Sequence, residues 1–262
     1  PQIAYYVSGY FDLVKSGAIS MGDEINVCVP TGNFGNILAA YYAREMGIPI
    51  KKFICASNAN NVLTDFFRDG RYDKRRDFHV TASPAMDILI SSNLERLIFA
   101  AADNDDKTIR KYMTKLAEDG AYTVSTEIFG KLSALFTGGC CDDEATLKTI
   151  SDVYSEYNYL VDTHTAVGVN VYNKYIEENG DDTVTLLAST ASPFKFADSV
   201  LSALGVDINS GGEELLEILS KTTSNKVPSP LASIFEKEER FVNTTTRENL
   251  SETVVKFTEG AL

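Results

Sequence analysis

The chain is poor in histidine and in basic residues, and it has no tryptophan. It holds two histidines, His79 and His164, and its 24 lysines and arginines stand against 37 aspartates and glutamates, a formal net charge of −13. Because nucleic acids and anionic membrane surfaces are themselves negative, this balance argues against both as partners. No apolar run approaches the roughly 18 residues that a membrane span needs, and the first residues do not resemble a secretory signal. We therefore expect a cytoplasmic protein.

Cysteine is also scarce, with four residues in 262. Cys28 and Cys55 lie inside apolar, strand-like runs and are interpreted as small core residues. Cys140 and Cys141 are adjacent, which is neither the spacing of a CxxC pair nor that of metal ligands. The sequence therefore predicts no metal site and indicates a reducing compartment.

The most informative segment runs from residue 25 to residue 47. An apolar run, Ile25 to Val29, stops at Pro30, and the Thr-Gly-Asn-Phe-Gly-Asn of 31–36 leads into an alanine-rich helical pattern. This order predicts a strand, a glycine-rich turn and the N-terminus of a helix. Unpaired backbone N–H groups converge at a helix start, and the helix dipole favours negative charge there. The turn is therefore predicted to bind an anion, most simply one phosphate group.

The spacing of the glycines narrows the kind of phosphate. Gly32 and Gly35 are three positions apart, so the turn matches neither the G-x-G-x-x-G fingerprint of dinucleotide sites nor the lysine-bearing P-loop of triphosphate sites. A compact phosphate monoester, such as pyridoxal phosphate or a sugar phosphate, fits the pattern better. Asn33 and Asn36 tolerate unusual backbone angles and add amide donors. Spacing alone leaves open an ordinary strand-to-helix turn that needs two glycines.

Strand and helix signals alternate along most of the chain, and 262 residues with 44% apolar side chains allow a large core. Such alternation is typical of an α/β fold, a parallel sheet flanked by helices. We expect a large α/β domain over residues 1–210 and a helical C-terminal segment, 211–262, packed on it. Strands are expected at 25–29, 51–56 and 184–188, extended pieces at 121–124 and 159–161, an irregular surface loop at 69–80, and helices at 1–16, 60–68, 94–102, 105–119, 126–135, 143–157, 165–178, 195–204, 213–221 and 246–258.

Four blocks of the chain resemble threonine synthase, a pyridoxal-phosphate enzyme of fold type II whose architecture is similar to that of the tryptophan synthase β subunit. The Pro-Thr-Gly-Asn-Phe-Gly-Asn of 30–36 looks like the cofactor-phosphate loop of that family. Three further blocks follow in the family's order: Ser83–Ile88, Asp162–Gly168 and Ser189–Phe196. The resemblance therefore covers the chain from residue 30 to about residue 200.

The resemblance implies roles for single residues. Backbone N–H groups of the loop would cradle the phosphate of pyridoxal phosphate, with the carboxamides of Asn33 and Asn36 assisting. Thr190 would meet the pyridine nitrogen with its hydroxyl; the plainer alternative is that it caps a helix. Phe34 could contact the cofactor or pack in the core. The implied cofactor-binding residues are Gly32, Asn33, Phe34, Gly35, Asn36 and Thr190.

The chain departs from the family pattern in two respects. In the last block, Ser192 and Phe194 replace the usual histidine and alanine. The family's Schiff-base lysine belongs to a Ser-Phe-Lys-Asp-like motif upstream of the phosphate loop, where this chain has only Lys15, and Lys195 lies downstream. Because the chain also begins with Pro1 rather than Met, we interpret it as the C-terminal portion of a threonine synthase, lacking the lysine segment and any catalytic residue of its own.

The resemblance implies a reaction for the whole enzyme, the conversion of O-phospho-L-homoserine and water to L-threonine and phosphate. By itself, the chain is expected to be inactive, to hold pyridoxal phosphate weakly or not at all, and to form homo-oligomers through exposed cleft surface. Two alternatives stay open. One is another fold-type-II lyase, such as a threonine dehydratase or a cysteine synthase, although these usually have a phosphate loop richer in glycine. The other is a non-catalytic phosphate-binding module.

The remaining polar features have weaker signals. His164 precedes a predicted helix, so both a contact at the mouth of the active site and a role in capping and packing stay open. His79 lies in a charged stretch and is expected to be exposed to solvent. Asp87 is assigned no catalytic role. The Ser-Asn-Ala-Asn-Asn of 57–61 follows a predicted strand end, which places it near the cleft.

Overall fold

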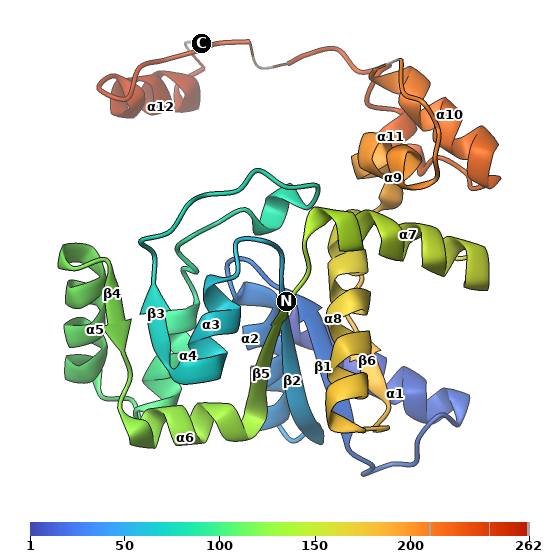
Figure 1. The fold of residues 1–262 in the computed structure, drawn as a ribbon. Coiled ribbons are helices and arrows are strands. Elements are labelled where there is room, and N and C mark those ends of the chain that lie inside the picture. The colour runs from blue at the N-terminus through green and yellow to red at the C-terminus, as the bar shows by residue number, and fades with distance from the viewer. Residues whose placement is uncertain (210, 241, 261–262) are drawn as a thin grey trace. The chain divides into compact units, whose positions relative to one another are not determined.

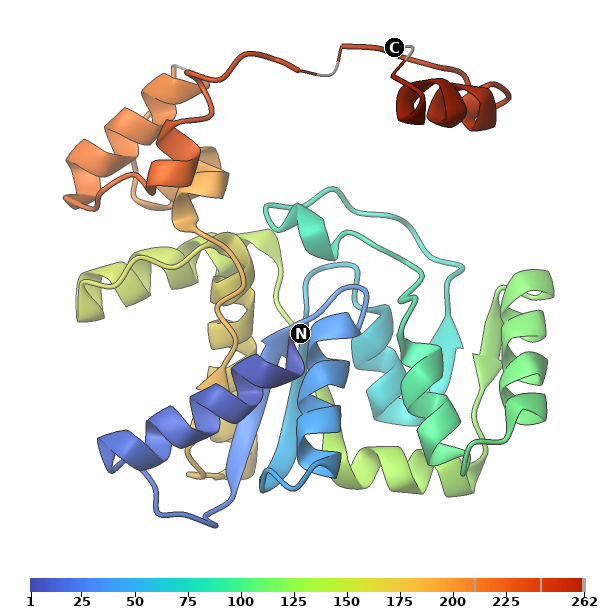
Figure 2. The same ribbon diagram turned by 180° about the vertical axis from the view of Figure 1, so that it is seen from behind.

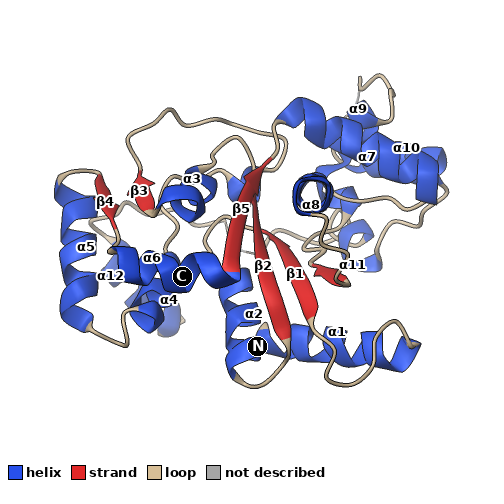
Figure 3. Ribbon diagram, turned by 60° about the horizontal axis from the view of Figure 1, so that its bottom comes forward, coloured by secondary structure: helices blue, strands red, loops and turns tan. Residues whose placement is uncertain are grey.

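The computed structural model describes residues 1–209, 211–240 and 242–260, and a four-stranded sheet lies at the centre of these. The strand order is β5-β2-β1-β6 and each pairing is parallel, so the carboxyl ends of the strands share one edge (Figure 3). Helices flank the sheet, which confirms the predicted α/β class. The strands are β1 (Ile25–Pro30), β2 (Ile50–Ser57), β5 (Phe136–Cys140) and β6 (Thr185–Leu187).

Successive residues of the central strands face opposite helical layers. Val27 and Phe53 join a core that includes α1 (Ile3–Ser16), α2 (Gly35–Glu45) and α3 (Val62–Asp69). Cys28 and Ile54, their sequence neighbours, pack instead against α8 (Thr163–Asn179). Figures 1 and 2 show α8 on one face of the sheet and α1 and α2 on the other. Burial on both faces explains why these strands are continuous apolar runs.

A second layer of helices and a two-stranded antiparallel sheet lies beside the main sheet. Its strands are β3 (Arg71–Asp73) and β4 (Ala121–Thr123). The expectation of an irregular loop over 69–80 was wrong for β3, because Tyr72 is buried and stacks on Tyr122 with ring centroids 5.5 Å apart. The helices of this layer are α4 (Leu94–Ala101), α5 (Asp106–Glu118) and α6 (Thr126–Leu135).

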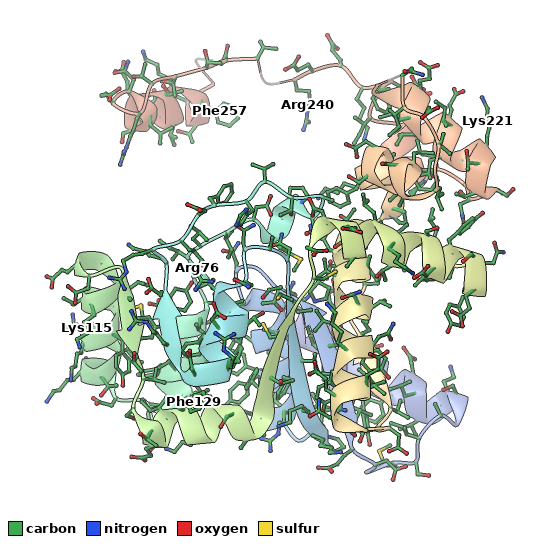
Figure 4. The ribbon with its side chains drawn as sticks, in the orientation of Figure 1. Arg76, Lys115, Phe129, Lys221, Arg240 and Phe257 are labelled. Atoms are coloured by element: carbon green, nitrogen blue, oxygen red, sulfur yellow. The ribbon has the colours of Figure 1, made fainter. Side chains whose placement is uncertain are left out.

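Close packing around glycines shapes the junctions of this layer. Gly70 ends α3 with a φ of +75°, and a Cβ there would lie 3.0 Å from Cδ2 of Phe129, the side chain labelled on α6 in Figure 4. Strand β5 was not predicted, because its Gly138 and Gly139 are poor strand formers. A Cβ at Gly138 would lie 2.9 Å from Cα of Thr64, so the helix α3 approaches this strand too closely for a side chain. Tertiary packing therefore favours glycine in β5, although glycine has a low intrinsic strand propensity.

The remaining elements of the first 225 residues are helical. The described residues 159–161 form no strand, so that expectation was wrong. The predicted helices at 143–157 and 195–204 are confirmed, the second as a short 3-10 turn running into an α-helix. These elements are α7 (Asp143–Tyr157), η1 (Pro84–Met86), η2 (Pro193–Phe196), α9 (Ala197–Ala203) and α10 (Glu213–Thr223).

The structure divides the chain into two compact units, residues 1–225 and residues 226–262. The helix α10 belongs to the first unit and buries Leu216 and Leu219. The second unit contains α11 (Ser229–Ala232) and α12 (Leu250–Thr258). The predicted division into 1–210 and 211–262 stays a prediction. Across the described ranges, every helix is too short or too polar to cross a bilayer.

Candidate functional site

The glycine-rich turn joins β1 to α2 at the carboxyl edge of the sheet. Thr31 extends the sheet by one residue, since its N–H donates to the carbonyl oxygen of Ala56 at 2.8 Å. Phe34 precedes α2 in the left-handed region, with φ 63° and ψ 4°, a costly conformation for a residue other than glycine. Its ring is buried between Phe67 and Phe136, at centroid distances of 5.9 and 6.0 Å. The side chain of Phe34 therefore lies in the core, and only its backbone faces the turn.

Hydrogen bonds from a neighbouring segment hold the carbonyl groups of the turn. Ser91 Oγ donates to the carbonyl oxygen of Gly32 at 2.7 Å. The backbone N and the Nδ2 of Asn93 donate to the carbonyl oxygen of Asn33 at 3.1 and 2.8 Å. In a trans peptide the N–H points away from the preceding C=O, so the N–H groups of Asn33 and Phe34 point away from Ser91 and Asn93. Sequence reasoning missed both residues, because neither lies near the turn in the sequence.

The backbone N–H groups of the turn have no partner within the described ranges. Among the described residues, none of the N–H groups of residues 32–37 donates a hydrogen bond, whereas the next one, of Leu38, donates to the carbonyl oxygen of Phe34 at 3.1 Å. A row of unpaired amides at the N-terminus of an eleven-residue helix is an anion-binding arrangement. The predicted anion turn therefore has the donors that such a site requires.

A cavity of about 340 Å³ lies beside the turn. It brings Asn36, at the start of α2, together with Thr190, just beyond β6, although the two are far apart in the sequence. The other predicted site residues, Gly32, Asn33, Phe34 and Gly35, lie in the adjoining turn and do not line this cavity. Its other walls come from the start of α1 and the end of β6, namely Gln2, Tyr5, Tyr6, Leu186, Leu187, Ala188 and Ser189.

Within the part of the chain that the structure describes, Thr190 makes no hydrogen bond. The helical turn that follows is capped by Ser192, whose Oγ accepts the N–H of Phe194 at 3.3 Å, so the reading of Thr190 as a helix cap was wrong. Thr190 is exposed at the carboxyl edge of the sheet, where open parallel sheets place ligand contacts. Lys195, in the same block, does not line the cavity, and its Nζ lies 5.5 Å from the ring centroid of Phe196.

A buried histidine, His164, is hydrogen-bonded to the η1 turn that packs against the glycine-rich turn. A Cβ at Gly32 would lie 3.0 Å from the carbonyl oxygen of Ala85, so the η1 turn packs directly against the glycine. The N–H of Ala85 donates to Nε2 of His164 at 3.2 Å, and Nδ1 of His164 lies 3.0 Å from Oδ1 of Asp162. With Nε2 accepting, the proton is placed on Nδ1 and the imidazole is neutral. His164 therefore packs and braces, and it does not line the cavity.

Asp162 orders the start of α8 beneath the same edge. Its carboxylate is fully buried and accepts the N–H of His164 at 2.9 Å and the hydroxyl proton of Thr165. Burial acts to raise the pKa of this carboxyl, but hydrogen bonds from His164 and Thr165 outweigh it and hold the pKa below its usual value. The carboxylate therefore stays ionised as a helix cap. His79, the other histidine, is exposed, as predicted.

An asparagine network ties a long connection to the end of β2. Oδ1 of Asp87 accepts from Nδ2 of Asn58 at 2.8 Å, from Nδ2 of Asn60 at 3.0 Å and from Oγ1 of Thr81 at 2.7 Å. These bonds engage Asp87 in holding the connection that leads to η1 and Ser91, the groups that brace the anion turn. The Asp87 carboxylate is therefore engaged in structural hydrogen bonds.

Comparison with known proteins agrees with this geometry. Residues 165–255 match the family model described as "Threonine synthase, C-terminal". Mouse Threonine synthase-like 1 is 41% identical over 239 residues, which are 90% of this chain and 31% of that protein. Threonine synthase of Schizosaccharomyces pombe is 36% identical over 224 residues, 78% of this chain and 43% of that protein. The chain thus spans between about a third and less than half of the length of these curated relatives.

Solved structures match over nearly the whole chain. The structure of PLP-bound threonine synthase from Brucella melitensis superposes with a TM-score of 0.80 at 32% identity, covering 98% of this chain and 50% of that one. Threonine synthase from yeast gives a TM-score of 0.81 at 31% identity, covering 99% of this chain and 52% of that one. With fold, family model and relatives in agreement, the chain belongs to the threonine synthase family.

Proposed function

We propose that the protein acts as a threonine synthase, which converts O-phospho-L-homoserine and water to L-threonine and phosphate, and that this chain carries its cofactor-phosphate site. The observation that carries the proposal is the row of unpaired N–H groups at 32–37 beside a cavity that Asn36 and Thr190 share. The matched threonine synthase from Brucella melitensis is described as PLP-bound, which supports pyridoxal phosphate as the ligand. The relatives at 41% identity carry the name Threonine synthase-like 1, so the substrate is tested directly below.

The residues present fit the phosphate end of that cofactor. The turn offers donors without acceptors, and α2 directs its positive dipole end at the same point. Gly32 leaves the backbone uncovered, because a side chain there would be driven into η1. Thr190, which lines the same cavity as Asn36, presents a neutral hydroxyl, which can hydrogen-bond a pyridine nitrogen without holding it protonated as a carboxylate would. When bound, the cofactor supplies an electron sink for charge that develops on an amino-acid substrate.

Among the described residues, no lysine lines the cavity that Asn36 and Thr190 share. Lys15 lies at the far end of α1 from the cavity, roughly 14 Å along the helix from Tyr6 by the rise of an α-helix. Lys195 does not line the cavity. We therefore propose that the Schiff-base lysine lies in a segment outside these 262 residues, and that the chain alone is inactive and holds pyridoxal phosphate weakly.

The test uses the protein encoded by the complete reading frame that contains this chain. We expect it to release phosphate from O-phospho-L-homoserine and to form L-threonine in equal amounts. L-threonine and O-acetyl-L-serine, offered as alternative substrates, test the dehydratase and cysteine synthase readings. Turnover of either in preference to O-phospho-L-homoserine would overturn the proposed reaction. Binding of pyridoxal phosphate without turnover of any substrate would favour the non-catalytic module.

The 262-residue chain serves as its own comparison. We expect no phosphate release from O-phospho-L-homoserine, and measurable release would contradict the proposed absence of the lysine. We also propose a cytoplasmic location for the protein. The isolated chain is proposed to form homo-oligomers, because large apolar side chains such as Tyr5, 71% exposed, line the cavity and are accessible to a second copy. Light scattering that shows a monomer at high concentration would contradict the second point.

A further inference from the structure

We propose that Tyr6 is a positioning residue for the phosphate site: its hydroxyl fixes the carboxamide of Asn36 so that the NH₂ group faces the ligand. The inference rests on the proposed function, because it concerns the same cavity. Both side chains line that cavity, and Tyr6 OH donates to Oδ1 of Asn36 at 2.6 Å. Tyr6 comes from α1 and Asn36 from the start of α2, so the contact joins two helices.

The hydrogen bond decides which edge of the carboxamide is left for a ligand. The planar carboxamide of asparagine has an acceptor, Oδ1, at one edge and a donor, Nδ2, at the other. With Oδ1 engaged by Tyr6, the unused edge is Nδ2, which has no partner among the described residues. An anion requires a donor, and a carboxamide turned the other way would present oxygen lone pairs to it. Tyr6 therefore stabilises the one orientation that helps the backbone N–H groups of the turn.

The environment of Tyr6 keeps its hydroxyl a donor. The residue is 3% exposed, and burial, with the nearby Cys28 thiol, raises the pKa of the phenol well above its ordinary value. The ring position is also fixed by the backbone. A Cβ at Gly9 would lie 2.9 Å from Cδ2 of Leu186, so α1 lies close against β6 at the wall of the same cavity.

The chain contains a matched control one turn along the same helix. Tyr10 is as buried as Tyr6, but its hydroxyl serves a distant turn: it accepts the N–H of Gly22 at 2.8 Å and donates to the carbonyl oxygen of Asp23 at 3.2 Å. Tyr6→Phe and Tyr10→Phe are thus the same chemical change in the same helix. Only the first removes a contact of the cavity.

The experiment compares pyridoxal phosphate with pyridoxal, which lacks the phosphate, by titration of the protein encoded by the complete reading frame. We expect Tyr6→Phe to weaken the binding of pyridoxal phosphate roughly five- to tenfold, the worth of one hydrogen bond, with pyridoxal unchanged. Tyr10→Phe should change neither affinity by more than about twofold. Combined with Asn36→Ala, Tyr6→Phe should have little further effect, because the two act as one unit. Melting temperatures of all variants monitor folding.

The outcomes separate the inference from the proposed function. Equal effects of Tyr6→Phe and Tyr10→Phe, or a Tyr6→Phe loss shared by pyridoxal, would overturn the positioning role and leave the phosphate site in place. Additive losses in the double variant would overturn it too. If the unchanged protein bound the two ligands equally well, the phosphate site itself would be wrong, and the inference would fail with it.

Discussion

The two edges of the central sheet differ in how far their polar groups are hydrogen-bonded. At the carboxyl edge, the N–H groups of residues 32–37 lack partners, and Phe34 adopts a strained left-handed conformation. At the amino edge, one carboxylate, that of Asp181, gathers hydrogen bonds from several elements. Its donors are Asn26 Nδ2 at 2.9 Å, Lys51 Nζ at 2.9 Å, Tyr175 OH at 2.7 Å and Thr183 Oγ1 at 2.6 Å.

The same strands therefore carry unpaired donors suited to binding at their carboxyl ends and stabilising hydrogen bonds at their amino ends. Asn26 is the second residue of β1, Lys51 is the second residue of β2 and Tyr175 lies on α8, so the Asp181 carboxylate joins the starts of two strands to a covering helix. Unpaired donors and backbone strain cost stability, and they persist where surrounding structure holds them in place. We infer that the amino edge contributes stability that allows the carboxyl edge to keep its donors free for a ligand.

The largest expected effect breaks the binding edge alone. In Gly32→Val, the new side chain would meet the backbone of Ala85 and Met86, at 3.0 and 3.2 Å from the Cβ position, and would displace the turn. We expect the affinity for pyridoxal phosphate to fall at least about a hundredfold, because several N–H donors lose their alignment together. Equilibrium dialysis with the protein of the complete reading frame measures it.

Gly35→Ala is the control for that change. A Cβ at Gly35 would lie 3.5 Å from Nδ2 of Asn93, an ordinary contact, and alanine is favoured over glycine within a helix. We expect its affinity to stay within about threefold of the unchanged protein. A comparable loss in both variants would mean that the helix start as a whole, and not the close approach at Gly32, sets binding.

The next effect breaks the stabilising edge. Asp181→Asn removes the charge that Lys51 and the neutral donors of Asn26, Tyr175 and Thr183 satisfy, and we expect it to lower the free energy of unfolding by about 2 kcal/mol. Lys51→Met should cost less than about 1 kcal/mol, because Lys51 is 44% exposed and its ion pair is screened by water. Urea unfolding measures both. The affinity for pyridoxal phosphate should stay unchanged in both variants; a parallel loss would contradict the separation of the two edges.

Sequence patterns predicted the parts of the fold that are encoded locally. The apolar run of β1, the glycines and asparagines of the turn and the alanine-rich α2 follow one another directly, so strand, turn and helix start could be placed. The parallel sheet followed from the alternation of elements. The structure places Thr190 in the cavity of Asn36; its position just after a predicted strand and the resemblance to the family both indicated a place near the ligand.

The features that were missed depend on contacts between distant segments. Strand β5 pairs with β2 although glycine disfavours strands, and its Gly138 and Gly139 leave room for the close approach of α3 and α8. The bond between Tyr6 and Asn36 and the Asp181 carboxylate join residues that no periodicity connects. The N–H groups of the turn are oriented by Ser91 and Asn93, which stand in a separate block. Local patterns therefore predicted an anion-binding turn, whereas the contacts that orient the turn depend on tertiary packing.

The smallest expected effect is the pH dependence of the stability that Asp181 contributes at the amino edge. Burial acts to raise the pKa of Asp181, but hydrogen bonds from Thr183, Tyr175, Asn26 and Lys51 outweigh it and hold the pKa well below its usual value. Because the folded pKa is lower than the unfolded value of about 3.9, the contribution is complete above that value and is lost as pH falls towards the folded pKa. Acid should therefore weaken the amino edge.

This loss can be counted in protons. Below about pH 4, the unfolded chain binds up to one proton more at Asp181 than the folded chain, a slope of at most about 1.4 kcal/mol per pH unit. Asp181→Asn has no carboxyl group to titrate at this position. The slope of its unfolding free energy against pH, measured in urea between pH 4 and pH 2.5, should therefore be smaller by the equivalent of up to one bound proton. Parallel slopes for the two proteins would show that Asp181 titrates alike in both states. Its hydrogen bonds would then not stabilise the amino edge, and the carboxyl edge would need another source of support for its unpaired donors.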